Sequence, residues 1–188
     1  MSLNVVKYGT PVLRHKGERI EHITAKVKQL AADMLETMYA SKGVGLAAEQ
    51  VGEALQLMVV DVRGVTERPS WLELEGKRAD VDAFMPLVLL NPAVTPAGKP
   101  DTGLEGCLSF PEIYADITRP GVVEVVGQDI KGERLAFRCG GLLARVIQHE
   151  RDHLQGILFI DRMDKKTKES LRPELDDLMA DTKATLKR

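Results

Sequence analysis

The sequence predicts an α+β fold, because its helical and strand-like patterns are segregated along the chain and do not alternate. Three observations support this prediction: an amphipathic helical stripe near the N-terminus, a central block of short apolar runs, and helical patterns in the last quarter. The chain has 188 residues, 44% of them hydrophobic, and can bury a sizeable core. We therefore expect 1–188 to form a single domain.

The first helix is expected over 23–40, where apolar side chains recur at three- and four-residue steps. Thr24 is a suitable N-cap for this helix, and Gly43 is a suitable stop. The apolar stripe is typical of a helix face that packs against a core.

Apolar runs of strand length follow at 57–62 and at 87–90, and an Asn-Pro pair closes the second run. The intervening stretch, 63–86, is charged and contains Trp71, the single tryptophan. We interpret it as a tolerated insertion that forms a surface excursion.

A β-hairpin is expected where 122–126 and 134–139, both rich in valine or aromatic residues, flank Lys131 and Gly132. A second helix is expected over 141–155 and ends before a glycine at position 156. The last stretch, 164–188, is expected to be a C-terminal helical tail that a proline at position 173 interrupts.

The composition excludes several classes of protein. A net charge of -2 shows no basic excess, so sequence-specific binding to nucleic acid is not expected. Two cysteines are too few for a disulfide framework. No run approaches the roughly 18 apolar residues of a membrane helix, and no targeting segment is recognisable, so we expect a cytoplasmic protein without membrane contact.

The strongest chemical signal is the run His149-Glu150-Arg151-Asp152-His153. Histidines four residues apart on a helix project to one side and can bind the same metal ion, and the glutamate between them can serve as an acid or base. Leu142 and Val146 continue the same helical face toward the N-terminus, so this face is expected to be buried. Asp152 is expected to support the site or to lie on the surface.

A catalytic site of this type needs a third protein ligand. One peptidase class uses the third histidine of H-E-x-x-H-x-x-G-x-x-H, but Phe159 occupies that position here. Glu174 and Cys107 remain as candidates. Glu174 with His149 and His153 would make the chain a zinc metallopeptidase, whereas Cys107 would supply a thiolate ligand. A buried free cysteine is the other option for Cys107 and the role expected for the second cysteine, at position 139.

Three segments together resemble the peptide deformylase family. The stretch 43–52 reads GVGLAAEQVG and is similar to the family's G-φ-G-L-A-A-P-Q, where φ is an apolar residue. The stretch 105–109 is identical to the family's E-G-C-L-S, and 148–153 matches Q-H-E-x-D-H. Because all three motifs occur in the family's order, the resemblance is specific.

The resemblance implies antiparallel sheets packed around a central helix carrying HExxH, with an N-terminal helix and a C-terminal helix. It implies metal-dependent hydrolysis of the N-formyl group from the N-terminal formyl-methionine of newly made polypeptides, with release of formate. The implied cofactor is one divalent ion, Fe(II) in the cell, for which zinc or nickel can substitute. The implied metal ligands are Cys107, His149 and His153. The implied catalytic groups are Glu150, Gln50 and the backbone N–H of Leu108. The implied substrate-binding residues are Val44, Gly45, Gly106, Leu142 and Val146.

Three residues depart from the family's pattern. Glu49 stands where proline is usual, Tyr114 stands where some members have a substrate-binding arginine, and Arg145 stands where many have an apolar residue. We expect the stem of Arg145 to line the methionine pocket while its guanidinium reaches solvent, with a pair to Glu49 as one option. An alternative to the enzyme is a non-catalytic, metal-stabilised paralogue on the ribosome, which some family members approach through a C-terminal helix.

Overall fold

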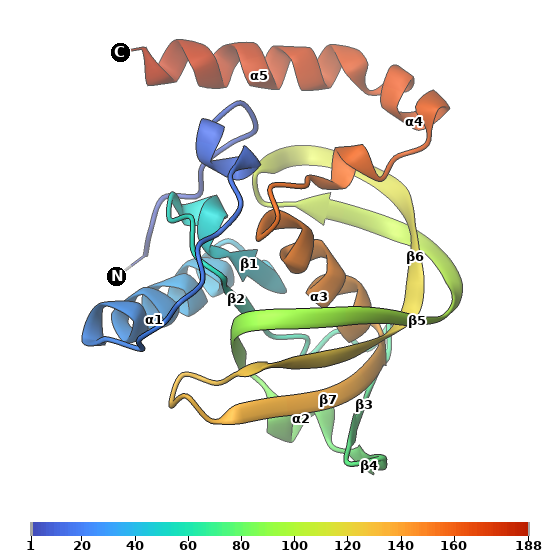
Figure 1. The fold of residues 1–188 in the computed structure, drawn as a ribbon. Coiled ribbons are helices and arrows are strands. Elements are labelled where there is room, and N and C mark those ends of the chain that lie inside the picture. The colour runs from blue at the N-terminus through green and yellow to red at the C-terminus, as the bar shows by residue number, and fades with distance from the viewer. Residues whose placement is uncertain (1, 188) are drawn as a thin grey trace.

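The computed structural model describes residues 2–187 and confirms the predicted α+β class. Within these residues, seven strands form one antiparallel sheet in the order β1-β2-β5-β6-β7-β3-β4. The strands are β1 (Gly45–Ala47), β2 (Leu57–Val60), β3 (Ser70–Leu74), β4 (Lys77–Ala79), β5 (Leu87–Cys107), β6 (Phe110–Gln128) and β7 (Arg134–Gly141). The helices are α1 (Ala25–Ala40), α2 (Val81–Phe84), α3 (Leu142–His153), α4 (Lys165–Ser170) and α5 (Arg172–Leu186). The sheet curls strongly, and α3 lies inside the curl (Figure 1).

The N-terminal helix agrees with the prediction at its start and differs at its end. The Thr24 side chain accepts a hydrogen bond from the backbone N–H of Val27, as expected of an N-cap. At the other end Lys42, and not Gly43, takes the left-handed conformation, with a φ of 55°. Gly43 packs against Leu108, since a Cβ at position 43 would lie 2.8 Å from Cδ1 of that side chain and would displace it.

The two central strands are far longer than the sequence patterns suggested. The predicted runs 87–90 and 122–126 are only parts of β5 and β6, which pair with each other from Leu90 and Gln128 to the tight turn after Cys107. The predicted closure by Asn-Pro after position 90 is wrong. The pairing instead shifts register there, because a bulge accommodates a proline that cannot donate to the ladder.

The stretch 63–86 is not a surface excursion. It contains β3 and β4, and β3 pairs with β7 in a register that sets Leu72 opposite Cys139. Leu72 is fully buried, whereas Trp71 on the other face of β3 is half-buried beneath the guanidinium of Arg78. Two of the charged residues that suggested a loop, Lys77 and Arg78, are exposed on the edge strand β4.

The predicted helices of the last quarter are present. Gly141, with a φ of 69°, precedes α3, and Gly156, with a φ of 70°, follows it. Every residue of α3 except Arg151 is buried. Pro173 lies in the first turn of α5, where its missing N–H costs nothing, so the tail breaks into α4 and α5. Among residues 2–187, no helix combines the length and the apolar composition needed to span a membrane.

Replacing Leu72 with alanine tests whether 63–86 is part of the core. We expect Leu72→Ala to lower the free energy of unfolding by about 2–5 kcal/mol, because it leaves a cavity at a fully buried position. Urea denaturation measures this, and Leu186→Ala, at a side chain that is 57% exposed, is the control. Equal small effects in both variants would restore the surface-loop interpretation.

Candidate metal centre and substrate pocket

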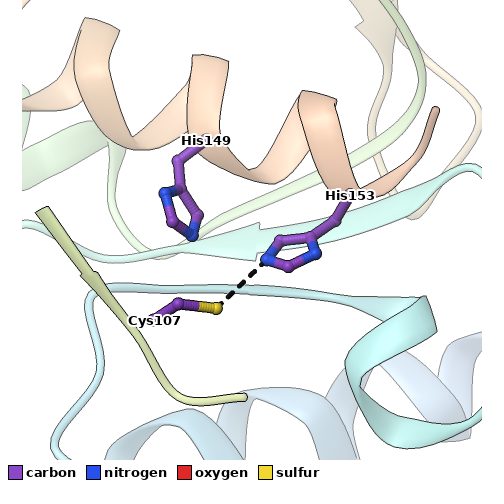
Figure 2. A group of neighbouring side chains, drawn as sticks. All are labelled: Cys107, His149 and His153. Atoms are coloured by element: carbon purple, nitrogen blue, oxygen red, sulfur yellow. Dashed lines mark hydrogen bonds between the residues drawn. The ribbon is translucent and has the colours of Figure 1, made fainter. Parts of the chain in front are cut away.

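Three side chains of metal-ligand type meet between the end of β5 and α3. Cys107, His149 and His153 each offer an atom that lies within 4.8 Å of the other two (Figure 2). The Cys107 Sγ is 3.3 Å from Nε2 of His153. A thiolate and two imidazoles suit a divalent ion of intermediate softness, such as zinc, iron or nickel, so the residues present fit a metal of this class.

The helical repeat and the turn after β5 produce this cluster. The two histidines lie one helical turn apart on the same side of α3, with ring centroids 5.1 Å apart. Cys107 is the last residue of β5, where the pairing with β6 shifts register as the chain turns back. The ligands thus come from two elements that are distant in sequence.

His149 is oriented by a carboxylate. Its Nδ1 is 2.9 Å from Oε2 of Glu105, which also accepts from Arg119. Although burial alone would raise the pKa of Glu105, the hydrogen bonds from His149 and Arg119 lower it to about 2, so this carboxylate is an acceptor. Nδ1 of His149 therefore donates, and Nε2 is left to face the cluster.

His153 lies deeper than His149. Burial lowers the pKa of its imidazole well below the ordinary value, and the nearby His149 and Arg119 act in the same direction. Its Nδ1 is buried without a hydrogen-bond partner among the described residues. The neutral imidazole is the form that binds a metal ion.

Glu150 and Gln50 lie beside the cluster. Burial raises the pKa of Glu150 to about 7, and its Oε2 has no hydrogen-bond partner within residues 2–187. Gln50 is held by Ala47, whose backbone N–H donates to Oε1 at 2.8 Å. The Gln50 Nε2 lies 3.4 Å from the Cys107 Sγ. An acid or base and an amide donor therefore adjoin the ligands.

A cavity of about 610 Å³ opens beside this group. All predicted site residues except His153 line it: Val44, Gly45, Gln50, Gly106, Cys107, Leu108, Leu142, Val146, His149 and Glu150. His153 belongs to the cluster of ligand atoms but does not line the cavity. Glu174, the alternative third ligand, is exposed on α5 and belongs to neither the cluster nor the lining.

Two glycines of the lining pack closely against side chains. A Cβ on Gly45 would lie 2.7 Å from Cγ1 of Val146 and still nearer to Oε1 of Glu150. A Cβ on Gly106 would lie 2.6 Å from the ring of Tyr114. These glycines let the backbones of β1 and β5 approach the cavity.

The expectations for Arg145 and Glu49 are wrong. The Arg145 guanidinium does not reach solvent: it is buried and donates to Glu105 and to Asp101. Arg145 is also among the residues that line the cavity. Glu49 has no partner for either carboxylate oxygen within the described chain. The guanidinium of Arg145 is paired with two acids of β5, Asp101 and Glu105, and not with Glu49.

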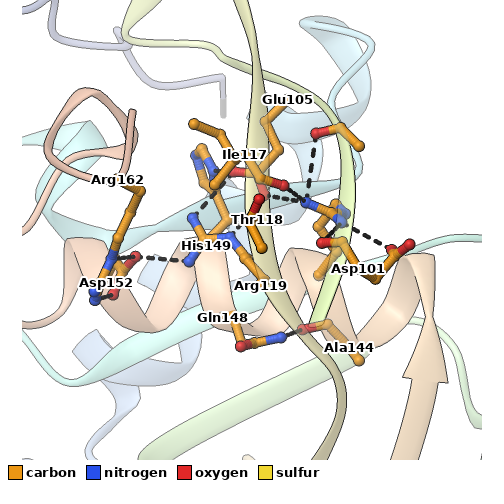
Figure 3. Close-up of polar contacts among 12 residues, drawn as sticks. Asp101, Glu105, Ile117, Thr118, Arg119, Ala144, Gln148, His149, Asp152 and Arg162 are labelled. Carbon is orange, nitrogen blue, oxygen red and sulfur yellow. Dashed lines mark hydrogen bonds and ion pairs between the residues drawn. The ribbon is translucent and has the colours of Figure 1, made fainter. Parts of the chain in front are cut away.

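Asp152 supports the site from the other side of α3. Its carboxylate accepts from Arg119 at 2.8 Å and from Arg162 at 2.7 Å. Arg119 thereby links Asp152 to Glu105 in one buried network of charges (Figure 3). Asp152 is not within the group of metal-ligand atoms.

Sequence reasoning missed the partners of the ligands. Glu105 precedes Cys107 by two residues in a recognised motif, which is a usable signal because alternate residues of a strand share one face. Arg119 carries no such signal, since only the β5–β6 pairing brings it to Glu105. Lys7 also lines the cavity and donates to the backbone oxygen of Leu108.

Comparisons with known proteins agree along the whole chain. A sequence model of the polypeptide deformylase family matches residues 2–169. The chain is 47% identical over 189 residues to the peptide deformylase of Opitutus terrae, covering 100% of this chain and 98% of that protein. It is 45% identical over 178 residues to that of Methylacidiphilum infernorum, covering 95% and 93%.

Solved structures give the same result. A variant of peptide deformylase 1B from Arabidopsis thaliana superposes with a TM-score of 0.83 at 38% identity, covering 100% of this chain and 95% of that one. A peptide deformylase from Plasmodium falciparum superposes with a TM-score of 0.81 at 33% identity, covering 96% and 98%.

The unpaired Glu49 predicts a pH-dependent stability. Burial, assisted by the nearby Glu150, raises the pKa of Glu49 from 4.5 to about 9. Between these values the folded chain keeps a proton that the unfolded chain loses, so the free energy of unfolding falls as pH rises through this window. Glu49→Gln carries no titrating proton and should be at least about 1 kcal/mol more stable than the wild type at pH 8.

Urea denaturation at pH 5 and pH 8 measures this difference. The gap between Glu49→Gln and the wild type should widen from pH 5 to pH 8. The exposed carboxylate of Glu67 provides the control, because Glu67→Gln should leave the pH dependence as it is. If wild type and Glu49→Gln lose the same stability over this range, Glu49 is not protonated in the folded protein.

Proposed function

The chain belongs to the polypeptide deformylase family, and from this premise we propose that it hydrolyses the N-formyl group of formyl-methionyl nascent peptides in a metal-dependent reaction that releases formate. The observation that carries the proposal is the cluster of Cys107, His149 and His153 beside Glu150 at the wall of the cavity. The whole stretch 1–188 acts as one domain in this proposal.

Cys107, His149 and His153 hold one divalent ion, and Fe(II) is the ion proposed for the cell, with zinc or nickel able to replace it. When bound, such an ion supplies Lewis-acid chemistry that polarises the formyl carbonyl and makes water a stronger nucleophile near neutral pH. A thiolate ligand from Cys107 would lower the net positive charge of the site. The helix α3, which carries both histidines, is the metal-bearing element of the proposal.

Glu150 moves the proton. Its carboxylate accepts a proton from the attacking water and delivers it to the amine nitrogen as the C–N bond of the formamide breaks. A pKa of about 7, raised by burial, suits a group that must accept and donate at neutral pH. Formate and the free N-terminal amine are the products.

Gln50 and Leu108 stabilise the negative charge that develops on the formyl oxygen. The Gln50 amide is already oriented by the backbone N–H of Ala47, so its Nε2 needs little reorganisation to donate. The backbone N–H of Leu108 is the second donor. Two preorganised donors of this kind can each contribute about 10²–10³ in rate.

The substrate backbone binds along the sheet. β1 is an edge strand, so the backbone at Val44 and Gly45 can add an extended peptide by strand pairing. Gly106 contributes the opposite wall, at the end of β5. Leu142 and Val146 form an apolar surface suited to the unbranched, polarisable side chain of methionine.

Two other functions have weaker support. A zinc peptidase with His149, His153 and Glu174 has no support from geometry, because Glu174 is exposed outside the cluster. Ribosome approach through the C-terminal helix rests on the family resemblance alone, and a contact there would be local, since the net charge of the chain is -2.

Formate release from formyl-Met-Ala-Ser by anaerobic, Fe(II)-loaded protein tests the reaction. Glu150→Gln should lower kcat by about 10²–10⁴ while metal content is retained, because it removes the proton carrier and keeps the shape of the side chain.

Gln50→Ala should lower kcat in the same assay by about 10²–10³, because it removes one donor to the formyl oxygen. No formate from fully loaded wild-type protein would leave the non-catalytic paralogue as the better account.

Metal binding separates the deformylase ligands from those of a peptidase. Cys107→Ala should lose bound metal, measured by elemental analysis of the dialysed protein, because two imidazoles alone hold the ion weakly. Glu174→Ala should retain both metal and activity. The reverse pattern, a metal-free Glu174→Ala with a loaded Cys107→Ala, contradicts the ligand set proposed here.

A further inference from the structure

Arg145 joins the strand that carries one proposed metal ligand to the helix that carries the other two. It lies on α3, one turn before His149, and its guanidinium is buried. Nη2 donates to the backbone oxygen and to Oδ2 of Asp101, both at 2.8 Å. Nη1 donates to the Ile117 carbonyl on β6 at 2.7 Å and to Oε1 of Glu105 at 3.0 Å.

The hydrogen bonds that Arg145 donates to β5 go to alternate residues of that strand. Asp101, Gly103 and Glu105 all present an oxygen to the same guanidinium, with the Gly103 carbonyl at 3.4 Å. Cys107 is the next residue in this series, two positions after Glu105. The distance between Cys107 and the histidines therefore depends on how β5 is held against α3, and Arg145 spans that gap.

Glu105 has both of its oxygens occupied. Its Oε1 accepts hydrogen bonds from Nε of Arg119, at 2.6 Å, and from Arg145. Its Oε2 accepts from Nη2 of Arg119, at 3.0 Å, and from Nδ1 of His149. Four donors leave this carboxylate a single orientation. Without Arg145, Oε1 would lose one of its two donors, and the carboxylate could rotate away from His149.

We propose that Arg145 is a positioning residue of the metal centre: it clamps β5 to α3 and holds Glu105 so that Nε2 of His149 faces Cys107. The inference rests on the proposed metal site, yet it concerns a side chain that is neither a ligand nor a proton carrier. In this proposal Arg145, which departs from the apolar residue that the family resemblance led us to expect there, serves the metal and not the peptide. Lysine cannot replace it, because one ammonium cannot reach acceptors on both Asp101 and Glu105 in this fork geometry.

The test is metal affinity, measured by competition of zinc with a chromophoric chelator. Arg145→Met should weaken zinc binding by about 10-fold or more, as is typical when a side chain that orients a metal ligand is lost. It should also lower kcat for formyl-Met-Ala-Ser more than it raises KM. The matched control is Arg151→Met on the same helix, whose side chain is outside this network. Arg151→Met should match the wild type in zinc affinity.

A double-mutant cycle separates positioning from plain stabilisation. In a Glu105→Gln background, Arg145→Met should change zinc affinity by a smaller factor than in the wild-type background, because the route to His149 is already broken and only the clamp to Asp101 and Ile117 is lost. Arg145→Lys retains the charge and is the substitute if Arg145→Met does not fold. It should still bind zinc several-fold more weakly than the wild type.

The outcomes are distinct. Wild-type zinc affinity and kcat in Arg145→Met or Arg145→Lys, whatever the loss in unfolding free energy, would reduce Arg145 to a structural clasp and overturn the proposal. A full effect of Arg145→Met in the Glu105→Gln background would overturn the route through Glu105. Failure of the proposed function would be seen separately, as absence of metal binding or turnover in the wild type.

Discussion

The site depends on one interaction, the contact of the Glu105 carboxylate with two guanidiniums and the His149 imidazole. An ionised carboxylate in a protein interior is tolerated only when it is paired and hydrogen-bonded on both oxygens. Arg119 and Arg145 provide that pairing and come from different elements, β6 and α3. The carboxylate therefore ties the β5–β6 hairpin to the buried helix while it orients a metal ligand. The same carboxylate oxygens therefore stabilise the fold and position the imidazole of His149.

Three buried glutamates show how surroundings alone separate chemical roles. Glu105 is paired, so its pKa falls to about 2. Glu150 is buried without a full complement of partners, and its pKa rises to about 7. Glu49 has no partner within the described residues, and burial raises its pKa to about 9. The first suits a permanent anion that orients an imidazole, the second suits proton transfer at neutral pH, and the third is a cost to stability.

The curled sheet explains how a chain of this size builds such a site without disulfides. Long paired strands wrap α3, so that the helix which carries the histidines is buried almost all round (Figure 1). The tight turn between β5 and β6, directly after Cys107, places the thiol beside the histidines of that helix. Glycines at 45 and 106 then keep the backbone close to the cavity, where a side chain would collide with Glu150 or Tyr114. The cavity is thus bounded by main chain on two sides, which suits recognition of a peptide backbone.

The sequence by itself determined the features that depend on local spacing. Helical periodicity put His149 and His153 on one buried face, and the three motifs identified Cys107, Glu150 and Gln50, all of which the fold brings to one cavity or to its wall. The lengths of β5 and β6, the inclusion of 63–86 in the sheet and the inward turn of Arg145 were decided only by the tertiary structure. The physical reason is that strand pairing and the pairing of buried charges join residues far apart in sequence, such as Arg119 with Glu105 and Arg145 with Asp101. No local pattern specifies which acid a buried arginine will meet.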